Sequence, residues 1–325
     1  MDRITLAHGN GGRLMHELIE KLCLEFSNKI LDEMADAAEL NIKESRLAFS
    51  TDSYVVRPLF FPGGDIGKLA VFGTVNDISM RGAKPLFLSL AFILEEGMEI
   101  AALEKIARSI GKAAGRAKVR VVTGDIKVVE KGAADKIFIN TSGIGVITGP
   151  VGVKAKAGDA IIINGAIAEH GMAILNAREG LGFISGIKSD STNLNFEVEK
   201  CLRASRNISV MRDPTRGGLA TTLNEIAKTS DLGIEIYEKE IPVKRSVKKM
   251  CDILGLDPLY IANEGKFVAF ATRKDAPRIK RAMGRGSRVI GHVVSEHEGE
   301  VYLRTKLGSS RVLPALERDQ LPRIC

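Results

Sequence analysis

Apolar positions follow helical spacing in some stretches of the first half of the chain and strand-like runs in others. Apolar residues recur every three or four positions in Leu14–Phe26 and Glu99–Ala117, which predicts two amphipathic helices. Short β-like runs lie at Leu47–Phe49, Leu69–Phe72, Leu86–Leu94, Val119–Val122 and Ile137–Ile147. This order of elements predicts an α+β or α/β fold.

The second half begins after a glycine- and proline-containing break at Gly149–Gly152. The elements predicted beyond it are a strand at Ala160–Ile163, helices at 217–229 and 246–255, and strands near 266–271 and 289–294. From Lys306 onward no period is sustained and two prolines follow, which predicts a mobile tail.

The length of 325 residues suits two domains, because one domain commonly takes about 150 residues. We therefore expect a first domain over 1–150, a second domain over 151–305 and the tail over 306–325. Apolar residues make up 45% of the chain and charged residues 27%, which is typical of a folded globular protein. The longest apolar run, Leu86–Leu94, is too short to cross a bilayer. The amino end shows no signal-peptide pattern, so we expect a cytoplasmic protein with no membrane partner.

The net charge of +7 lies entirely in the second half. Arg273–Arg288 holds seven basic residues and one acid, Asp275. Such a segment forms either a docking patch for an acidic partner or a solvated helix face. The absence of Trp and the lack of aromatic residues within the segment argue against nucleic-acid binding.

The four cysteines are scattered along the chain without CxxC spacing, which argues against a zinc site and a disulfide framework. Cys23, Cys201 and Cys251 lie in helix-like stretches and are interpreted as small core or surface fillers. Cys325 differs because it is the last residue, where a thiol is exposed to chemistry.

Acidic residues follow several apolar runs. Asp52, Asp77 and Asp125 each follow such a run within a few residues, and Asp213 is a fourth candidate. Carboxylates brought together repel one another unless a cation neutralises them. Hard oxygen ligands suit Mg²⁺, which commonly also binds the phosphates of a nucleotide. The competing interpretation is that these are ordinary turn residues.

Two glycine-rich stretches precede predicted helices, one before the first helix and one before the helix at 217–229. Glycine there lets backbone N–H groups approach phosphate oxygens at a helix start. Neither stretch is a Walker motif. The candidate nucleotide-binding residues in the two stretches are Gly9, Asn10, Gly11, Gly12, Thr215, Gly217 and Gly218.

Seven motifs, in order along the chain, resemble the HypE family of hydrogenase maturation proteins, within the aminoimidazole-ribotide synthetase (PurM-like) ATP-binding superfamily. They are HGNGG at 8–12, STDSYVV at 50–56, GTVNDISMRGAKP at 73–85, TGDIKVV at 123–129, MRDPTRGGLA at 211–220, ANEG at 262–265 and PRIC at 322–325. The PRIC ending is specific to HypE, whereas the others define the superfamily. One departure is Ile126, where the motif has Thr.

The resemblance implies a PurM-like two-domain fold of mixed sheets with packed helices, and a flexible C-terminal tail. It also implies a carbamoyl dehydratase. A carbamoyltransferase, HypF, would place a carbamoyl group on Cys325, and this chain would use ATP and Mg²⁺ to dehydrate the S-carboxamide to a thiocyanate. The cyanide would pass to iron on a HypC–HypD complex as a ligand of [NiFe]-hydrogenase. The alternatives are a small-molecule enzyme of the same fold, such as aminoimidazole-ribotide synthetase or thiamine-phosphate kinase, and a non-enzymatic scaffold.

The resemblance assigns roles to individual residues. Lys127 and Glu264 match the family's catalytic lysine and glutamate, and Cys325 is the carrier. A homodimer formed through the first domain is implied, with ATP near the shared interface. The residues expected near Mg²⁺ and the phosphates are Asp52, Asn76, Asp77, Asp125 and Asp213.

Overall fold

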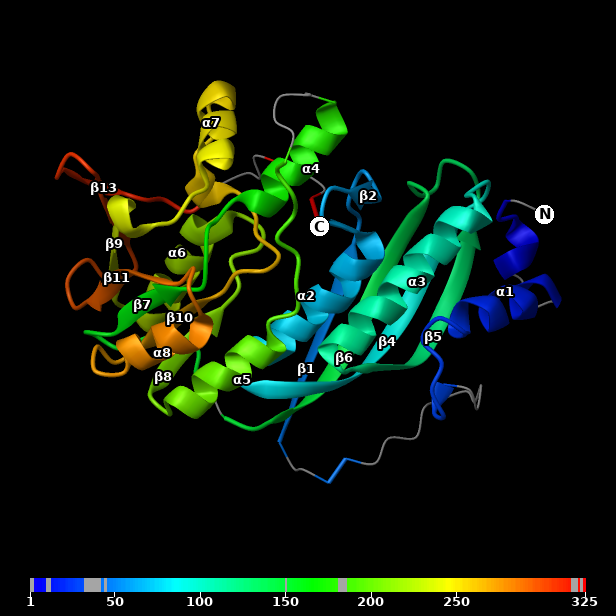
Figure 1. The fold of residues 1–325 in the computed structure, drawn as a ribbon, viewed down its shortest axis with the longest axis horizontal. Helices are drawn as coiled ribbons and strands as arrows, with labels where there is room; N and C mark the ends of the chain where they lie inside the picture. Colours follow the sequence, from blue (N-terminus) through cyan, green and yellow to red (C-terminus); the bar gives the residue numbers. More distant parts are fainter. Residues whose placement is uncertain are drawn as a thin grey trace.

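The computed structural model describes residues 3–9, 13–31, 42–43, 46–149, 151–180, 186–316, 321 and 324–325. Two β-sheets organise these residues, one in each half of the chain, and the carboxyl end returns to a position between the halves (Figure 1). The first sheet consists, in spatial order, of β1 (Leu47–Tyr54), β6 (Ile137–Ile147), β4 (Ala83–Glu95) and β5 (Arg120–Val129).

Helices α2 (Ile66–Met80) and α3 (Ile100–Ala117) lie side by side over one face of this first sheet (Figure 1). Strands β4 and β5 are parallel, and the other two pairs in the sheet are antiparallel. The helices leave the opposite face uncovered, because side chains on alternate positions of β1 and β6 are at least partly exposed.

The second half forms a seven-stranded sheet. In spatial order it consists of β13 (Ser310–Val312), β12 (Val301–Arg304), β9 (Gly233–Tyr237), β11 (Arg288–Val294), β7 (Ala160–Ile163), β10 (Val268–Ala271) and β8 (Ile208–Arg212). Its helices are α4 (Glu169–Glu179), α5 (Asn195–Ala204), α6 (Gly218–Ser230), α7 (Arg245–Leu254) and α8 (Ala276–Met283). The remaining elements are η1 (Leu6–Gly9), α1 (Arg13–Cys23), β2 (Phe60–Phe61), β3 (Gly64–Asp65), η3 (Glu238–Glu240) and η4 (Pro258–Tyr260).

The predicted mixture of helices and strands is confirmed, but one predicted strand is wrong. Leu69–Phe72 lies inside α2, and thirteen of the fifteen residues of α2 are buried. A helix packed on all sides shows no apolar stripe, so its sequence resembles that of a buried strand. Asp77 therefore lies on a helix and not after a strand. Asp52 and Asp125 lie within strands β1 and β5 rather than after them.

The carboxyl-terminal segment contains more structure than its sequence pattern predicts. Ser310–Val312 pairs with β12 as an edge strand whose three side chains are all exposed, so it lacks apolar alternation. Leu313 is fully buried and Ile324 is 6% exposed. The end of the chain is therefore packed against the body in this structure, and its mobility stays a prediction.

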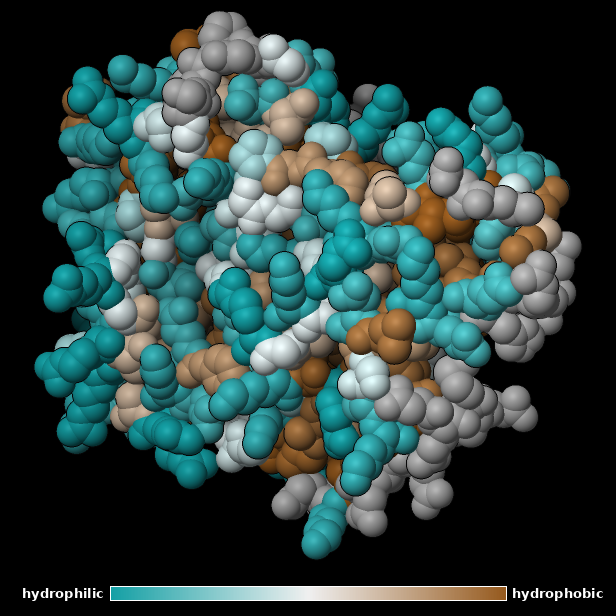
Figure 2. Space-filling view, turned by 45° about the vertical axis from the view of Figure 1, so that its right-hand side comes forward, coloured by the Kyte–Doolittle hydropathy of each residue, from teal (hydrophilic) through white to brown (hydrophobic). Residues whose placement is uncertain are grey.

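The surface is mainly polar. Hydrophilic side chains cover most of the face shown in Figure 2, with smaller hydrophobic patches between them. In the basic segment, α8 buries Ala276, Ile279 and Met283 and so presents its charges outward, as the solvated-face interpretation requires. Among the described residues, no helix has both the length and the apolar character needed to cross a membrane.

Candidate active site

Acidic side chains gather where β1 meets α2. Ser50 and Tyr54 lie at alternate positions on the side of β1 that faces α2, and Asp52 lies between them. The Ser50 hydroxyl donates to Asp77 Oδ2 at 2.8 Å, and the Tyr54 hydroxyl donates to Asp52 Oδ2 at 3.3 Å. The two predicted aspartates of this region therefore share one face of the sheet.

Asp213 joins this group from the second half of the chain. It follows β8 and begins a tight turn, in which the Thr215 N–H donates to the Asp213 carbonyl at 3.0 Å. A cavity of about 590 Å³ lies between the two halves, and its walls include Ser50, Asp77, Asp213 and Thr215. The cavity has the size of a small-ligand site.

The second glycine-rich stretch closes tightly at the start of α6. Gly217 and Gly218 have φ of +72° and +62°. A Cβ on Gly218 would lie 2.6 Å from the Leu259 carbonyl oxygen, so only glycine allows this close approach. The predicted helix entry is confirmed here, whereas Asn10, Gly11 and Gly12 lie outside the described residues and Gly9 ends η1.

The electrostatics of the cluster are unfavourable without a cation. Burial, and then the charges of Asp213 and Asp52, raise the pKa of Asp77. Burial also raises the pKa of Asp213, with Asp52 adding to the effect. No group of three His, Cys, Asp or Glu side chains within the described residues is arranged as a complete metal site. The cluster therefore offers carboxylate oxygens but not a finished coordination shell.

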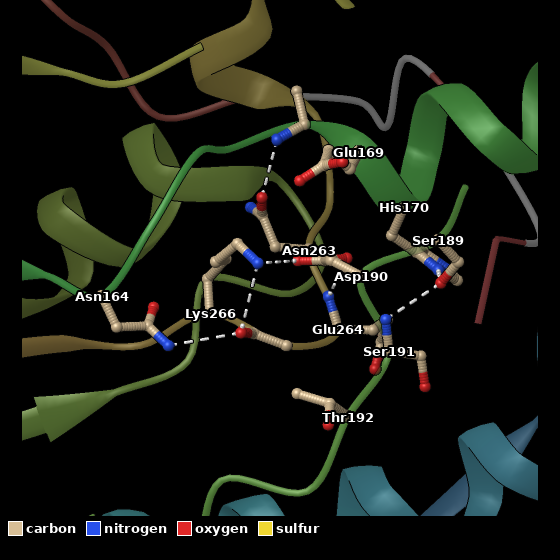
Figure 3. A network of polar contacts seen from close by, with 12 residues as sticks. Asn164, Glu169, His170, Ser189, Asp190, Ser191, Thr192, Asn263, Glu264 and Lys266 are labelled. Atoms are coloured by element: carbon tan, nitrogen blue, oxygen red, sulfur yellow. Dashed lines mark hydrogen bonds and ion pairs between the residues drawn. The ribbon is translucent and has the colours of Figure 1, made fainter. Parts of the chain in front are cut away.

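Glu264 lies at the centre of a buried polar network (Figure 3). Its side chain is 5% exposed, and its N–H donates to Asp190 Oδ1 at 3.2 Å. Lys266 Nζ forms an ion pair with Asp190 Oδ2 at 3.2 Å. Burial, followed by the charges of Asp213, Asp190, Asp52 and Asp77, raises the pKa of Glu264 well above its ordinary value. Glu264 is therefore close to the acidic cluster, and its surroundings favour the protonated carboxyl over the carboxylate.

The carboxyl end of the chain reaches the same region. The Val55 N–H donates to the Cys325 carbonyl oxygen at 3.2 Å, and His170 Nε2 lies 2.6 Å from the Ile324 carbonyl oxygen. Val55 directly follows Tyr54, whose own pKa is raised by burial and by the nearby charges of Asp52 and Glu264. Cys325 is only partly buried, whereas burial raises the pKa of the Cys201 thiol to about 12.

Asp125 and Lys127 lie apart from this cluster within one chain. Both are on β5, the far edge of the first sheet, three strands from β1 or roughly 14 Å. Asp125 shares a register row with Ser53, one residue from Asp52, so it projects from the face opposite α2. Lys127 Nζ pairs with Asp125 Oδ1 at 2.9 Å, and both side chains are more than half exposed. The four aspartates thus do not converge within a single chain.

Asn76 connects the two halves. Its Nδ2 donates to the Thr192 carbonyl at 3.0 Å, and its Oδ1 accepts from the Leu194 N–H at 2.8 Å. Its side chain is 1% exposed and positions the segment that precedes α5. Its predicted role at the phosphates stays a prediction.

Sequence reasoning missed five residues of this region. Contacts between distant segments bring together His170, Ser189, Asp190 and Lys266, and Tyr54 joins the acidic cluster through Asp52. Tyr54 lies inside the STDSYVV motif and could have been singled out from it, whereas the other four lie outside every matched motif.

Comparisons with known proteins relate both halves of the chain to known domain families. Residues 34–147 match the family model described as AIR synthase related protein, N-terminal domain, and residues 156–304 match the corresponding C-terminal domain. The chain is 47% identical to the carbamoyl dehydratase HypE of Azotobacter vinelandii, over 99% of this chain and 97% of that protein.

Solved structures agree. A crystal structure of the hydrogenase maturation protein HypE in complex with ATP matches with a TM-score of 0.95 at 49% identity, covering 98% of this chain and 99% of that one. A chain from a HypE–HypF complex matches with a TM-score of 0.81 at 48% identity, covering 94% and 100%.

The two matched domains define the class as a two-domain protein with the AIR synthase related, PurM-like fold. Within this class the chain belongs to the HypE family of carbamoyl dehydratases. The family inferred from the motifs is therefore confirmed. The thiamine monophosphate kinase of Aquifex aeolicus matches with a TM-score of 0.60 at 19% identity, over 90% of this chain and 98% of that one, which shows a shared fold alone.

Proposed function

We propose that this protein is an ATP-dependent carbamoyl dehydratase that converts an S-carboxamide on Cys325 into a thiocyanate, the source of cyanide ligands in [NiFe]-hydrogenase maturation. The observation that carries the proposal is the position of the chain end. The Val55 N–H binds the Cys325 carbonyl, and the adjacent Tyr54 donates its hydroxyl to Asp52, so the docked chain end lies near the acidic cluster.

The chemistry requires an activated oxygen and a base. An amide oxygen is a poor leaving group. Once ATP has phosphorylated this oxygen, the leaving group is phosphate. The carboxamide nitrogen must then lose both of its protons for the nitrile to form. The products are the thiocyanate, ADP and phosphate. The group attached to the sulfur loses the elements of one water, and its oxygen leaves as part of the phosphate.

Glu264 is the proposed base. Burial, and then the charges of Asp213, Asp190, Asp52 and Asp77, raise its pKa. These surroundings disfavour ionisation of the carboxyl, which must precede acceptance of a proton. Positive charge brought into the cluster favours that ionisation.

The acidic cluster fits Mg²⁺. Asp52, Asp77 and Asp213 offer hard carboxylate oxygens. Burial first, and then repulsion from neighbouring carboxylates, raise the pKa of Asp77 and of Asp213, and a bound divalent cation would offset both effects. When bound there, Mg²⁺ would neutralise charge on the phosphates of ATP. We propose that these three residues hold it, with Gly217, Gly218 and Thr215 contributing to the phosphate site.

A homodimer would complete the site. Lys127 and Asp125 face away from Glu264 in their own chain, on the uncovered face of the first sheet. This face also exposes Leu47, Phe49 and Ile93, at 45%, 68% and 43%. Packing two such faces together would bury this apolar surface, and we propose that Lys127 of the partner subunit then approaches Glu264.

We propose HypF as the carbamoyl donor and a HypC–HypD complex as the cyanide acceptor. Similarity to the HypE chain of a HypE–HypF complex supports the first of these. A cytoplasmic location is also proposed, supported by four cysteines with no disulfide-framework spacing.

The decisive experiment follows the terminal sulfur. The protein is incubated with HypF, carbamoyl phosphate and ATP, and its carboxyl-terminal peptide is weighed by mass spectrometry. We expect the carbamoylated peptide to lose one water only when ATP is present. Cys325→Ala should abolish both adducts while nucleotide-dependent melting is retained, and Cys23→Ala is the matched control. Cyanylation of another residue in the Cys325→Ala protein would refute the assignment.

A further inference from the structure

His170 is the only histidine of the described residues that is fully buried, and it contacts the end of the chain. Its Nε2 lies 2.6 Å from the Ile324 carbonyl oxygen, and its Nδ1 lies 2.8 Å from Ser189 Oγ. A carbonyl can only accept, so Nε2 carries the hydrogen. Nδ1 of the neutral ring then accepts from the Ser189 hydroxyl. Burial lowers the pKa of His170, which favours this neutral form.

Ser189 is itself held in place. Its Oγ accepts from the Ser191 N–H at 3.1 Å, and its N–H donates to the Pro62 carbonyl at 2.8 Å. The Phe61 ring packs edge-on against His170, with ring centroids 5.7 Å apart. Both halves of the chain therefore fix the orientation of the imidazole. Figure 3 shows His170 and Ser189 pointing toward each other, with the red end of the chain beside them.

The end of the chain has two polar anchors on consecutive residues. Ile324 is bound at its carbonyl by His170, and Cys325 is bound at its carbonyl by the Val55 N–H. The Ile324 side chain is 6% exposed and Leu321 is 8% exposed. Leu321 reaches Gly171, where an added Cβ would lie 3.4 Å from Leu321 Cδ1. The anchors and this apolar contact define one docked position for the thiol.

We propose that His170, oriented by Ser189, is a positioning residue that latches the docked end of the chain and so presents Cys325 to the dehydration site. The inference rests on the proposed function, because it concerns the same carrier thiol. His170 does not touch the reacting atoms. Its effect is to set the fraction of time that Cys325 spends docked.

The latch has opposite consequences for the two steps of the reaction. Dehydration requires the docked position, whereas carbamoyl transfer from HypF requires the thiol to be accessible to another protein. Loss of the latch should therefore slow dehydration and leave carbamoyl transfer unchanged or faster. A general loss of structure would slow both.

The test compares His170→Leu with His170→Gln and Ser189→Ala. The amide nitrogen of Gln can still donate to the Ile324 carbonyl, whereas Leu cannot. Ser189→Ala keeps His170 but removes the group that orients it. His292→Leu is the control, because His292 bonds the Tyr237 hydroxyl on the distant sheet at 3.1 Å.

Three rates are measured on each full-length variant: alkylation of Cys325 by iodoacetamide, carbamoylation by HypF, and dehydration of the pre-carbamoylated protein at saturating ATP. Alkylation is followed on the 319–325 peptide released by cleavage before Asp319. For His170→Leu, loss of one hydrogen bond should shift the ratio of docked to undocked chain ends about tenfold, so the fold-increase in alkylation multiplied by the fold-loss of dehydration should be about ten. Ser189→Ala should show a smaller change in the same directions, and His170→Gln and His292→Leu should resemble the native protein.

Slower carbamoylation together with slower dehydration in His170→Leu and Ser189→Ala would overturn the proposal. Unchanged alkylation of Cys325 in these two variants would also overturn it. Should His170→Leu fail to fold, the rates of Ser189→Ala and His170→Gln still test the latch. If the native protein forms no thiocyanate, the proposed function fails, whereas the alkylation rates still report on the latch.

Discussion

The two faces of the first sheet carry the same kinds of residue in opposite environments. On the face toward α2, Asp52 and Asp77 are drawn together with Asp213, and Asp77 and Asp213 have raised pKa values. On the other face, Asp125 is more than half exposed and paired with Lys127. The comparison shows that an aspartate next to an apolar run acquires its chemistry from the face on which it projects.

The difference also explains why neither face suffices. The α2 face has negative charge and the buried Glu264, the proposed base, but no lysine among the groups that shift the pKa of Glu264. The uncovered face has the lysine but neither enclosure nor base. In the proposed isologous dimer the two uncovered faces pack on each other, so Lys127 of the partner subunit would have to reach Glu264 past the edge strand β1.

The largest expected effect comes from removing the proposed base on the α2 side. Glu264→Gln keeps the shape of the side chain but cannot accept a proton, so dehydration of the carbamoylated protein should fall by about 10²–10⁴-fold. Single-turnover mass spectrometry measures it. Glu225→Gln, which breaks only an exposed pair with Arg212, should leave the rate unchanged. Persistence of more than a tenth of the native rate in Glu264→Gln would remove Glu264 from the mechanism.

The second prediction asks whether the two faces work together across subunits. Lys127→Ala and Glu264→Gln should each be inactive alone. After mixing and subunit exchange, half of the dimers are mixed and one site in each is intact, so about a quarter of native activity should return. The dehydration rate before and after exchange measures this. Failure of any activity to return would show that Lys127 and Glu264 do not act across subunits.

The smallest effect concerns stability. The pKa of Asp77 is raised from 3.8 to about 8, so the folded protein holds a proton that the unfolded chain releases over this range. Its burial therefore destabilises the fold progressively as pH rises from about 4 to about 8. Asp77→Asn should raise the free energy of unfolding clearly at pH 8 and have little effect at pH 4.

Urea unfolding at the two pH values checks this prediction. Asp125→Asn, on the uncovered face, is the matched control and should leave the pH dependence unchanged. Mg²⁺ with ATP should stabilise the native protein but not Asp77→Asn. Equal pH slopes in the native and Asp77→Asn proteins would show that Asp77 is not the titrating group.

Much of the fold follows from local patterns. Ile137–Ile147 and Ala160–Ile163 were predicted with their observed bounds, and the predicted helix at Glu99–Ala117 begins one residue before α3. The pattern does not reveal α2, because a helix buried on all sides lacks an apolar stripe. It also does not predict β13, whose side chains are all exposed.

The sequence by itself determined the elements, the family and the residue types that carry the chemistry, including the terminal cysteine. Only the tertiary structure decided that Asp52 and Asp125 project from opposite faces, and that His170 and Val55 bind the chain end. Side-chain alternation along a strand is local, but the order of strands in a sheet and the partner of a buried imidazole depend on contacts between segments far apart in the chain.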